Sequence, residues 1–117
     1  MSCLSKSHRL NNSKDFNQLY KSGKRWHTHT FVAFFMPNKN TKLAFVASKK
    51  VGNAIKRAKA KRKLRALCLK YENKLIDGKY IFVAKEKIFE KDYKNFEKDF
   101  FYAMKKLQLL KENEKNI

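Results

Sequence analysis

Apolar residues near the start of the chain recur at a helical spacing. Phe16, Leu19 and Tyr20 fall at positions i, i+3 and i+4 and therefore share one face. We predict a short helix over this stretch, with Ser13 as its cap and an end at about Ser22, just before a glycine.

Three later runs of β-branched and aromatic residues predict strands. Residues 30–36 and 42–48 flank a loop of hairpin length and composition, so we expect them to form an antiparallel pair. Residues 79–85 are apolar at their centre, as in a buried strand, and residues 24–30 fit an edge strand or an extended link. Alternate residues of 30–36 are apolar on both sides. One face therefore covers the core, and the other is covered too or presents aromatic rings to a ligand.

Two longer helices complete the pattern. The first has Asn53 as its expected N-cap and runs to about Ile76; the second runs from its cap Asp92 to about Leu110. The apolar stripe of the first, about 100° wide, consists of Ala60, Leu64, Leu67, Cys68, Tyr71 and Leu75.

The order of these elements is α-β-β-β-α-β-α. This order predicts an α+β fold, a two-layer sandwich of helices on an antiparallel or mixed sheet. A chain of 117 residues fits a single domain. We expect its polar ends, residues 1–12 and 111–117, to be flexible.

Charge distribution points to the kind of partner. The formal net charge is +19, and it is uneven: up to Tyr71 there are 18 Lys and Arg against one acid, Asp15, and beyond it 11 against 9. Seven of ten residues from Lys56 to Arg65 are basic, and they share a helix with the apolar stripe. A dense cationic surface fixed on a folded core indicates a polyanionic partner.

Aromatic residues favour RNA as that partner. Five of them precede the basic helix, and aromatic rings beside a basic groove can stack unpaired bases. Any one of the five can instead belong to the core. We see no helix-turn-helix or zinc finger that would favour DNA. The five are Phe16, Tyr20, Phe31, Phe34 and Phe35.

Signals for independent catalysis are weak. The chain has no cluster of carboxylates, no G-x-S-x-G and no P-loop. His27 and His29 alternate but lack a third ligand, and no Cys/His group has zinc spacing, so we expect no metal and no cofactor on the protein.

No apolar run is long enough to span a membrane, and the N-terminus lacks the apolar region of a signal peptide, so we expect a cytoplasmic protein. A basic helix lying on an anionic membrane is an alternative. It is disfavoured because the apolar stripe can pack on the strands.

The block SKKVGNAIKRAKAKRKLR at residues 48–65 resembles the signature of the bacterial ribonuclease P protein subunit, S-K-K-x-G-N-A followed by R-N-R-x-K-R-x-x-R. Upstream, RLNNSKDFNQLYKSGK is similar to the family's opening, R-L-x-x-x-x-D-F-x-x-[VL]-[FY]-x-x-G. The similarity continues through DGKYIFVAK and the last helix. One departure is that Ala58 and Lys59 stand where the family has Asn and Arg, without the amide and the bidentate fork.

The resemblance implies a fold and a function. The fold has a central four-stranded sheet with a left-handed crossover between parallel strands, as in a ribosomal protein domain. The protein would be the RNA-binding subunit of the ribonuclease P holoenzyme, an endoribonuclease that removes the 5′ leader of precursor tRNA. The catalytic RNA would carry out Mg²⁺-dependent hydrolysis, with no catalytic residue from the protein. The partners would be that RNA and precursor tRNA, with no membrane and no small-molecule substrate.

The resemblance also implies two groups of site residues. Those expected to contact the catalytic RNA are Lys49, Asn53, Arg57, Lys59, Lys61, Arg62 and Arg65. Those expected to line a leader cleft, between the first helix and the sheet, are Phe16, Tyr20, Val32, Phe34 and Lys50. The alternative is a ribosome-associated RNA-binding protein of similar fold without a nuclease role, which would not need an aromatic cleft.

Overall fold

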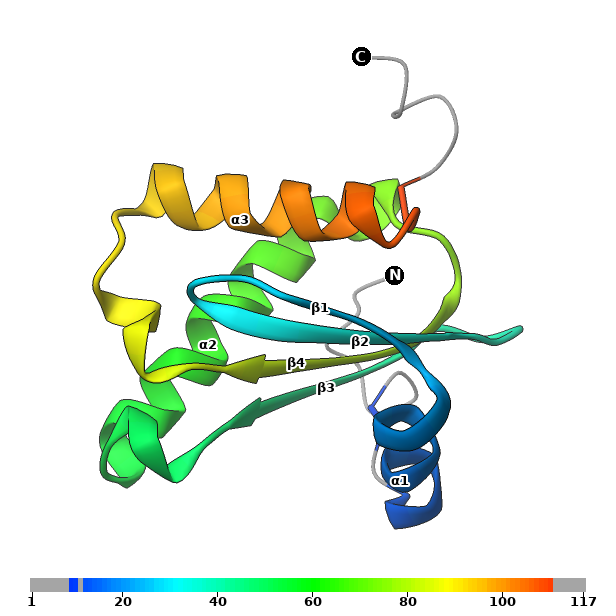
Figure 1. Ribbon diagram of the computed structural model, residues 1–117, viewed down its shortest axis with the longest axis horizontal. Coiled ribbons are helices and arrows are strands. Elements are labelled where there is room, and N and C mark those ends of the chain that lie inside the picture. The colour runs from blue at the N-terminus through cyan, green and yellow to red at the C-terminus, as the bar shows by residue number, and fades with distance from the viewer. Residues whose placement is uncertain (1–8, 11, 111–117) are drawn as a thin grey trace.

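The computed structural model describes residues 9–10 and 12–110. Its sheet is built from β1 (Lys24–His27), β2 (Phe31–Pro37), β3 (Lys42–Ala47) and β4 (Gly78–Ala84). Its helices are α1 (Ser13–Ser22), α2 (Ala54–Tyr71) and α3 (Tyr93–Lys106). Single 3₁₀ turns are η2 (Lys49–Val51), η3 (Glu72–Lys74) and η4 (Glu86–Phe89). Helices α2 and α3 cover one face of the sheet, and α1 packs on part of the other (Figure 1). The predicted α+β class is confirmed.

The strand order is β1-β2-β4-β3, so β4 lies between β2 and β3. It pairs antiparallel with β2 and parallel with β3, which makes the sheet mixed. The predicted pairing of residues 30–36 with 42–48 is therefore wrong. Strand β4 takes the central place because a strand covered on both faces must be apolar on both, and Tyr80, Ile81 and Phe82 are all fully buried. The parallel neighbours β3 and β4 are joined through α2, as a crossover requires.

Each of the helices α1, α2 and α3 begins with a side-chain cap. The cap of α1 lies one residue before the predicted position. Asn12, and not Ser13, caps α1: its Oδ1 accepts a hydrogen bond from the Lys14 N–H at 2.9 Å. Asn53 and Asp92 cap α2 and α3 as predicted. Asn and Ser are equally good caps, so adjacent candidates cannot be ranked from sequence.

Helices α2 and α3 end earlier than predicted, at Tyr71 and Lys106. The chain turns after each helix, and Leu75 forms a bridge with Leu110. Both leucines are buried, so the apolar pattern that suggested longer helices reflects burial in the turns beyond them.

Two apolar clusters lie on the two faces of the sheet. The larger one, under α2 and α3, contains Phe31 and Phe35 of β2 and the predicted stripe of α2. The smaller one, under α1, contains Leu19 and Phe34. Full burial of each such side chain contributes about 1.5–3 kcal/mol. The prediction that both faces of β2 are apolar and that one of them covers the core is confirmed.

The end of the predicted flexible lead-in is docked on the sheet. The Leu10 N–H donates to the Leu43 carbonyl of β3 at 2.9 Å, and the Leu10 side chain is buried. The rest of that prediction, for residues 1–8, 11 and 111–117, falls outside the described residues.

Helices α2 and α3 are joined by a polar contact at their surface. The Tyr71 hydroxyl donates to Glu97 at 2.5 Å, and the Lys70 ammonium lies 3.1 Å from the same carboxylate oxygen. These two donors, Tyr71 first, hold the pKa of the Glu97 carboxyl below its usual value. The pKa of Lys70 is raised in turn, chiefly by its hydrogen bond to Glu97.

Candidate nucleic-acid interface

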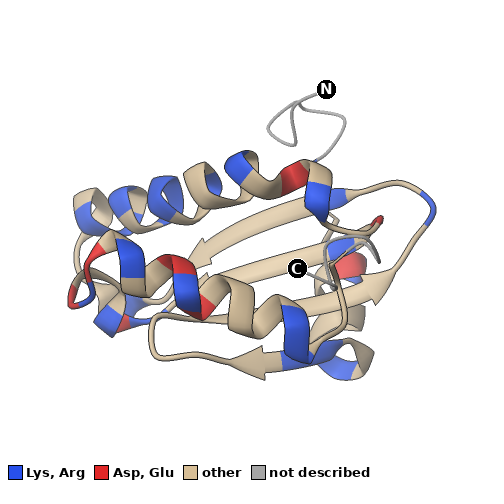
Figure 2. Cartoon of the chain, turned by 90° about the horizontal axis from the view of Figure 1, so that it is seen from above, with Lys and Arg blue, Asp and Glu red and all other residues tan. Residues whose placement is uncertain are grey.

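Helix α2 carries its charge against its own dipole. It has no acidic residue, and its first turn already contains Lys56 and Arg57, where the helix dipole disfavours cations. The Asn53 cap and the burial of its apolar stripe must offset this repulsion. Figure 2 shows Lys and Arg along most of α2, whereas α3 mixes both signs. A bound polyanion would relieve the repulsion.

Four cationic side chains of α2 converge on one groove. It lies between α2 and the carboxyl end of β3, has a volume of about 700 Å³, and is open to solvent. Arg57, Lys61, Arg62 and Arg65 line it together with Ala47, Ala54 and Ala58. The small alanine side chains leave the space that the cations surround. Such a groove fits a phosphate backbone, because arginine forks bind phosphate oxygens in pairs.

An aromatic ring lies beside one of these arginines. The guanidinium carbon of Arg65 lies 5.6 Å from the centre of the Phe45 ring of β3, which is half-buried. A cation over a ring is attracted by the ring's negative face. Phe45 therefore favours an Arg65 orientation at the groove and leaves its donors available to an anion.

Three other residues predicted to contact RNA lie outside the groove. Lys59 is exposed on another side of α2, and Lys49 is exposed on η2. The Asn53 side-chain oxygen accepts from the Lys56 N–H at 3.0 Å and serves as the cap. Lys63 also points elsewhere, since its ammonium donates to the Ile88 carbonyl at 3.3 Å. One helix thus presents cations to more than one side.

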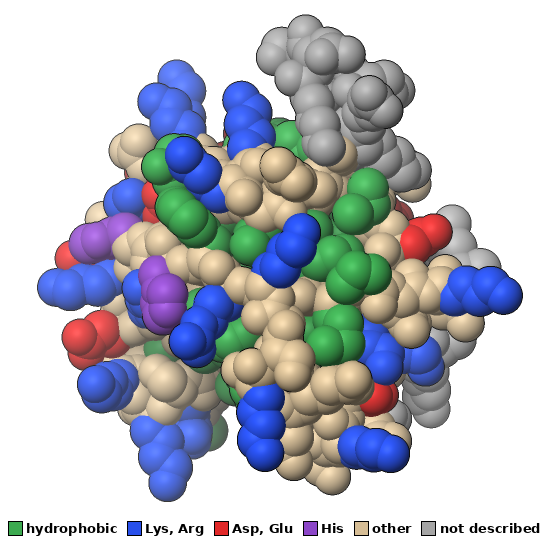
Figure 3. All heavy atoms as spheres, turned by 45° about the vertical axis from the view of Figure 1, so that its right-hand side comes forward, with side chains coloured by type: hydrophobic (Ala, Val, Ile, Leu, Met, Phe, Trp, Pro, Cys, Tyr) green, Lys and Arg blue, Asp and Glu red, His purple; other side chains and the backbone are tan. Residues whose placement is uncertain are grey.

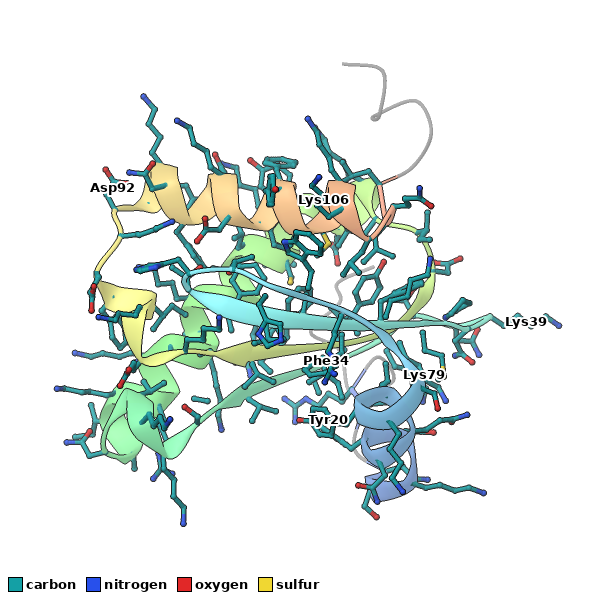
Figure 4. The ribbon with its side chains drawn as sticks, viewed as in Figure 1. Tyr20, Phe34, Lys39, Lys79, Asp92 and Lys106 are labelled. Atoms are coloured by element: carbon teal, nitrogen blue, oxygen red, sulfur yellow. The ribbon has the colours of Figure 1, made fainter. Side chains whose placement is uncertain are left out.

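Four of the five residues predicted for the leader cleft lie on the α1 face of the sheet. The Tyr20 and Phe34 rings meet edge to face, with centres 4.9 Å apart (Figure 4). The Phe16 ring centre lies 6.2 Å from that of Tyr20. Phe34 and Val32 are almost fully buried, whereas Tyr20 is 39% exposed. Partial burial raises the pKa of Tyr20 above its usual value, so its hydroxyl is neutral at physiological pH. The accessible rings are those of Tyr20 and Phe16, and Phe34 supports them.

The rest of this face extends from α1 towards η2. Val32, Val83 and Val46 are neighbours across three strands, and the last two are only half-buried. Lys50, the fifth predicted cleft residue, is exposed on η2, just beyond the carboxyl end of β3. Figure 3 shows hydrophobic side chains exposed on the side of the molecule that carries α1 and β1, with Lys and Arg between and around them.

The single acid of the N-terminal half, Asp15, is paired. Its carboxylate lies 2.9 Å from the Lys79 ammonium, which joins α1 to β4. Both side chains are mostly buried, and the contact fixes α1 on the sheet beside the aromatic rings. The carboxylate therefore has a structural partner.

Within residues 9–10 and 12–110, no group of three or more His, Cys, Asp or Glu side chains is placed to hold a metal ion. His29 instead lies 4.0 Å from Glu90. None of the helices in the described part of the chain has the length and apolar character to cross a membrane.

Sequence reasoning placed Val32 and Phe34 of β2 but missed the residues that β3 and β4 contribute to the interface. Ala47 lines the groove from β3, Phe45 lies beside Arg65, and Val46 and Val83 extend the α1 face. In the sequence, only the alternation of side chains along each predicted strand indicated these positions. Their partners come from distant segments, so the strand order was needed to place them.

Comparison with known proteins gives one consistent family. A family profile described as Ribonuclease P matches residues 4–108. The ribonuclease P protein component of a Nitratiruptor species is 38% identical over 99 residues, which cover 85% of this chain and 91% of that protein. The one from Streptococcus agalactiae serotype Ia is 30% identical over 104 residues, covering 87% and 95%.

Solved structures share the fold. The RNase P protein of Staphylococcus aureus matches with a TM-score of 0.79 at 24% identity, covering 91% of this chain and all of that one. The RNase P protein from Thermotoga maritima matches with a TM-score of 0.70 at 24% identity, covering 80% and 92%.

Proposed function

The chain belongs to the family of ribonuclease P protein components, and from this premise we propose that it binds two RNAs on two surfaces. The groove of α2 binds the catalytic RNA of ribonuclease P. The α1 face of the sheet binds the unpaired 5′ leader of precursor tRNA. The ribonucleoprotein then removes that leader to give the mature 5′ end.

The convergence of Arg57, Lys61, Arg62 and Arg65 carries the first half of the proposal. Four fixed cations around a groove supply a strong and sequence-independent attraction for a folded RNA backbone. The part of α2 that lines the groove also packs on the core, so the cations are held in place before RNA arrives. Less conformational entropy is then lost on binding.

The exposed ring of Tyr20 and the half-buried ring of Phe16 support the second half. A flexible leader offers unpaired bases, and stacking on an aromatic ring contributes about 1–3 kcal/mol per base. The half-buried valines beyond the rings provide an apolar floor that leads towards Lys50, whose ammonium can meet a leader phosphate.

In this proposal the catalytic RNA holds the Mg²⁺ ions and performs the hydrolysis. The protein's cations reduce the electrostatic repulsion between the catalytic RNA and the substrate. Less Mg²⁺ is then needed to bring the two RNAs together.

The test is reconstitution with the partner RNA. Cleavage of a precursor tRNA is measured at low Mg²⁺ with RNA alone, with protein alone and with both. We expect rapid cleavage only with both. Lack of stimulation would favour a ribosome-associated RNA-binding protein, and cleavage by protein freed of RNA would assign the chemistry to the chain itself.

A further inference from the structure

A pair of aromatic side chains lies at the β1 edge, away from both surfaces described so far. Trp26 of β1 and Tyr102 of α3 have ring centres 5.9 Å apart at an angle of 59°. Tyr102 is 52% exposed, an unusual amount for a large ring that could have packed inward. Trp26 is half-buried against the main core, which holds its ring in place.

A lysine ammonium lies close to both rings. The Lys106 Nζ is 5.4 Å from the centre of Tyr102 and 5.8 Å from that of Trp26. In the part of the chain that the structure describes, Lys106 makes no ion pair and the Tyr102 hydroxyl makes no hydrogen bond. Figure 4 shows Lys106 at the C-terminal end of α3, over β1.

The charges around this pair are also free to meet an anion. The two acids of α3, Glu97 and Asp99, are paired with Lys70 and Lys91. The exposed lysines of α3 have no acidic partner among residues 9–10 and 12–110; they are Lys94, Lys98, Lys105 and Lys106. Helix α3 contains four lysines and two acids, and because both acids pair with lysines outside the helix, its unpaired charge is positive.

Strand β1 joins this cluster to the α1 face. Trp26 lies opposite Ala33, on the face that α2 and α3 cover, whereas Arg25 lies opposite Phe34 and faces the α1 side. Because side chains alternate along a strand, neighbouring residues of one edge strand serve both faces. A strand of RNA that crosses the α1 face can therefore bend round β1 and reach Trp26.

The direction of the leader follows from the proposed function. The catalytic RNA lies at the α2 groove, beside β3, so the cleavage site must lie towards that edge of the sheet. The sheet order then places β1 at the opposite edge, about 15 Å away by the usual strand spacing. The part of the leader farthest from the cleavage site leaves the protein over β1.

We propose that Trp26, Tyr102 and Lys106 form a second leader subsite, which stacks an unpaired base of the distal leader and binds its phosphate. This inference rests on the proposed function. An exposed contact between an ammonium and a ring is weaker than stacking of a base on the ring. An arriving base therefore displaces Lys106 from the rings, and its long side chain turns to the adjacent phosphate.

The experiment uses the holoenzyme reconstituted with the partner RNA. Binding is measured for a precursor with a long leader, for one trimmed to the nucleotides next to the cleavage site, and for mature tRNA. The variant is Tyr102→Ala, with Tyr102→Phe to restore the ring. Tyr93→Ala is the matched control, because Tyr93 lies on the same helix and is 50% exposed, but near Lys70.

We expect the wild type to bind the long leader more tightly than the trimmed one. Tyr102→Ala should weaken long-leader binding by about fivefold to a hundredfold, the loss of one stacked base, and leave the trimmed precursor unchanged. Tyr102→Phe and Tyr93→Ala should match the wild type.

Three results would overturn the subsite. The wild type could bind both precursors equally, Tyr102→Ala could weaken them equally, or the variant could lose affinity for the partner RNA alone, which would assign the ring to that RNA. Failure of the proposed function looks different: the wild-type holoenzyme would then bind a trimmed precursor no better than mature tRNA, and both proposals would fall.

Discussion

Ala58 lies on the floor of the α2 groove, where the ribonuclease P signature has an asparagine. The methyl group of Ala58 cannot form the directed hydrogen bonds that an asparagine amide makes. The neighbouring cations Arg57 and Arg62 remain. In the proposed complex, recognition at this point would therefore depend on charge and on the space left by a methyl group.

Replacing Arg62 tests whether the groove contacts phosphate. Arg62→Ala should weaken assembly with the catalytic RNA and lower the slope of log affinity against log salt by about one, because one phosphate contact is lost. The measurement is an RNA titration at several salt concentrations. Lys59→Ala, on the same helix but outside the groove, is the control and should change the slope less. An unchanged slope for Arg62→Ala would exclude phosphate contact there.

Phe16 and Phe34 should respond differently to truncation. Phe16→Ala should weaken binding of precursors by about 1–3 kcal/mol for the lost stacking and spare mature tRNA. Phe34→Ala should instead destabilise the fold by about 3–5 kcal/mol, because Phe34 is only 8% exposed. Binding assays and thermal unfolding of both variants check this. If Phe16→Ala affected precursor and mature tRNA equally, its ring would be a packing residue.

At the scale of elements, the contact between α2 and α3 depends on a carboxylate with a lowered pKa. Such a group stabilises the fold above its ordinary pKa, 4.5 for Glu97, and the contribution is lost as the pH falls through the lowered value. The sign follows because the unfolded state binds the proton more readily. Acid should therefore loosen α3 from α2.

Glu97→Gln provides the measurement. The variant should be less stable than the wild type at neutral pH, since it loses the charge that Lys70 and Tyr71 bind. It should also lose less stability than the wild type as the pH drops below 4.5. Urea unfolding at a series of pH values compares the two. Parallel curves would show that Glu97 contributes nothing specific.

Periodicity was enough to predict which elements exist, and not which of them are neighbours. The stripe from Ala60 to Tyr71 and the runs at β2, β3 and β4 are local patterns that the structure confirms. The insertion of β4 between β2 and β3 depends on which strand buries most on both faces, a property of the whole sheet. The burial of Phe34 under Tyr20 has the same origin, since alternation assigns a face and not the ring that covers it.

At the scale of the whole molecule, β3 separates the two proposed RNA surfaces. Ala47 lines the α2 groove and Phe45 lies against Arg65, whereas Ala44 and Val46 belong to the α1 face. In the proposed complex, the alternation of this one strand would set the distance between the two RNAs. The protein would then align a substrate strand with the catalytic RNA without supplying a catalytic group.

The net charge of +19 predicts opposite effects of salt on the free chain and on its complex. Salt screens the self-repulsion of the free chain, so its Tm should rise with NaCl. The stabilisation that RNA adds should fall over the same range, because salt weakens binding. Thermal unfolding with and without the partner RNA measures both. A free chain whose Tm fell with salt would show that repulsion is not a significant cost to its fold.

The central position of β4 has a consequence for biosynthesis. A ribosome releases β2, β3 and the basic helix before it releases Gly78–Ala84, the strand that must enter between the first two. Until then the nascent chain has most of its excess charge and no closed sheet. Pairings between such distant segments form slowly. The emerging polypeptide therefore attracts nucleic acid electrostatically before its own interior has assembled.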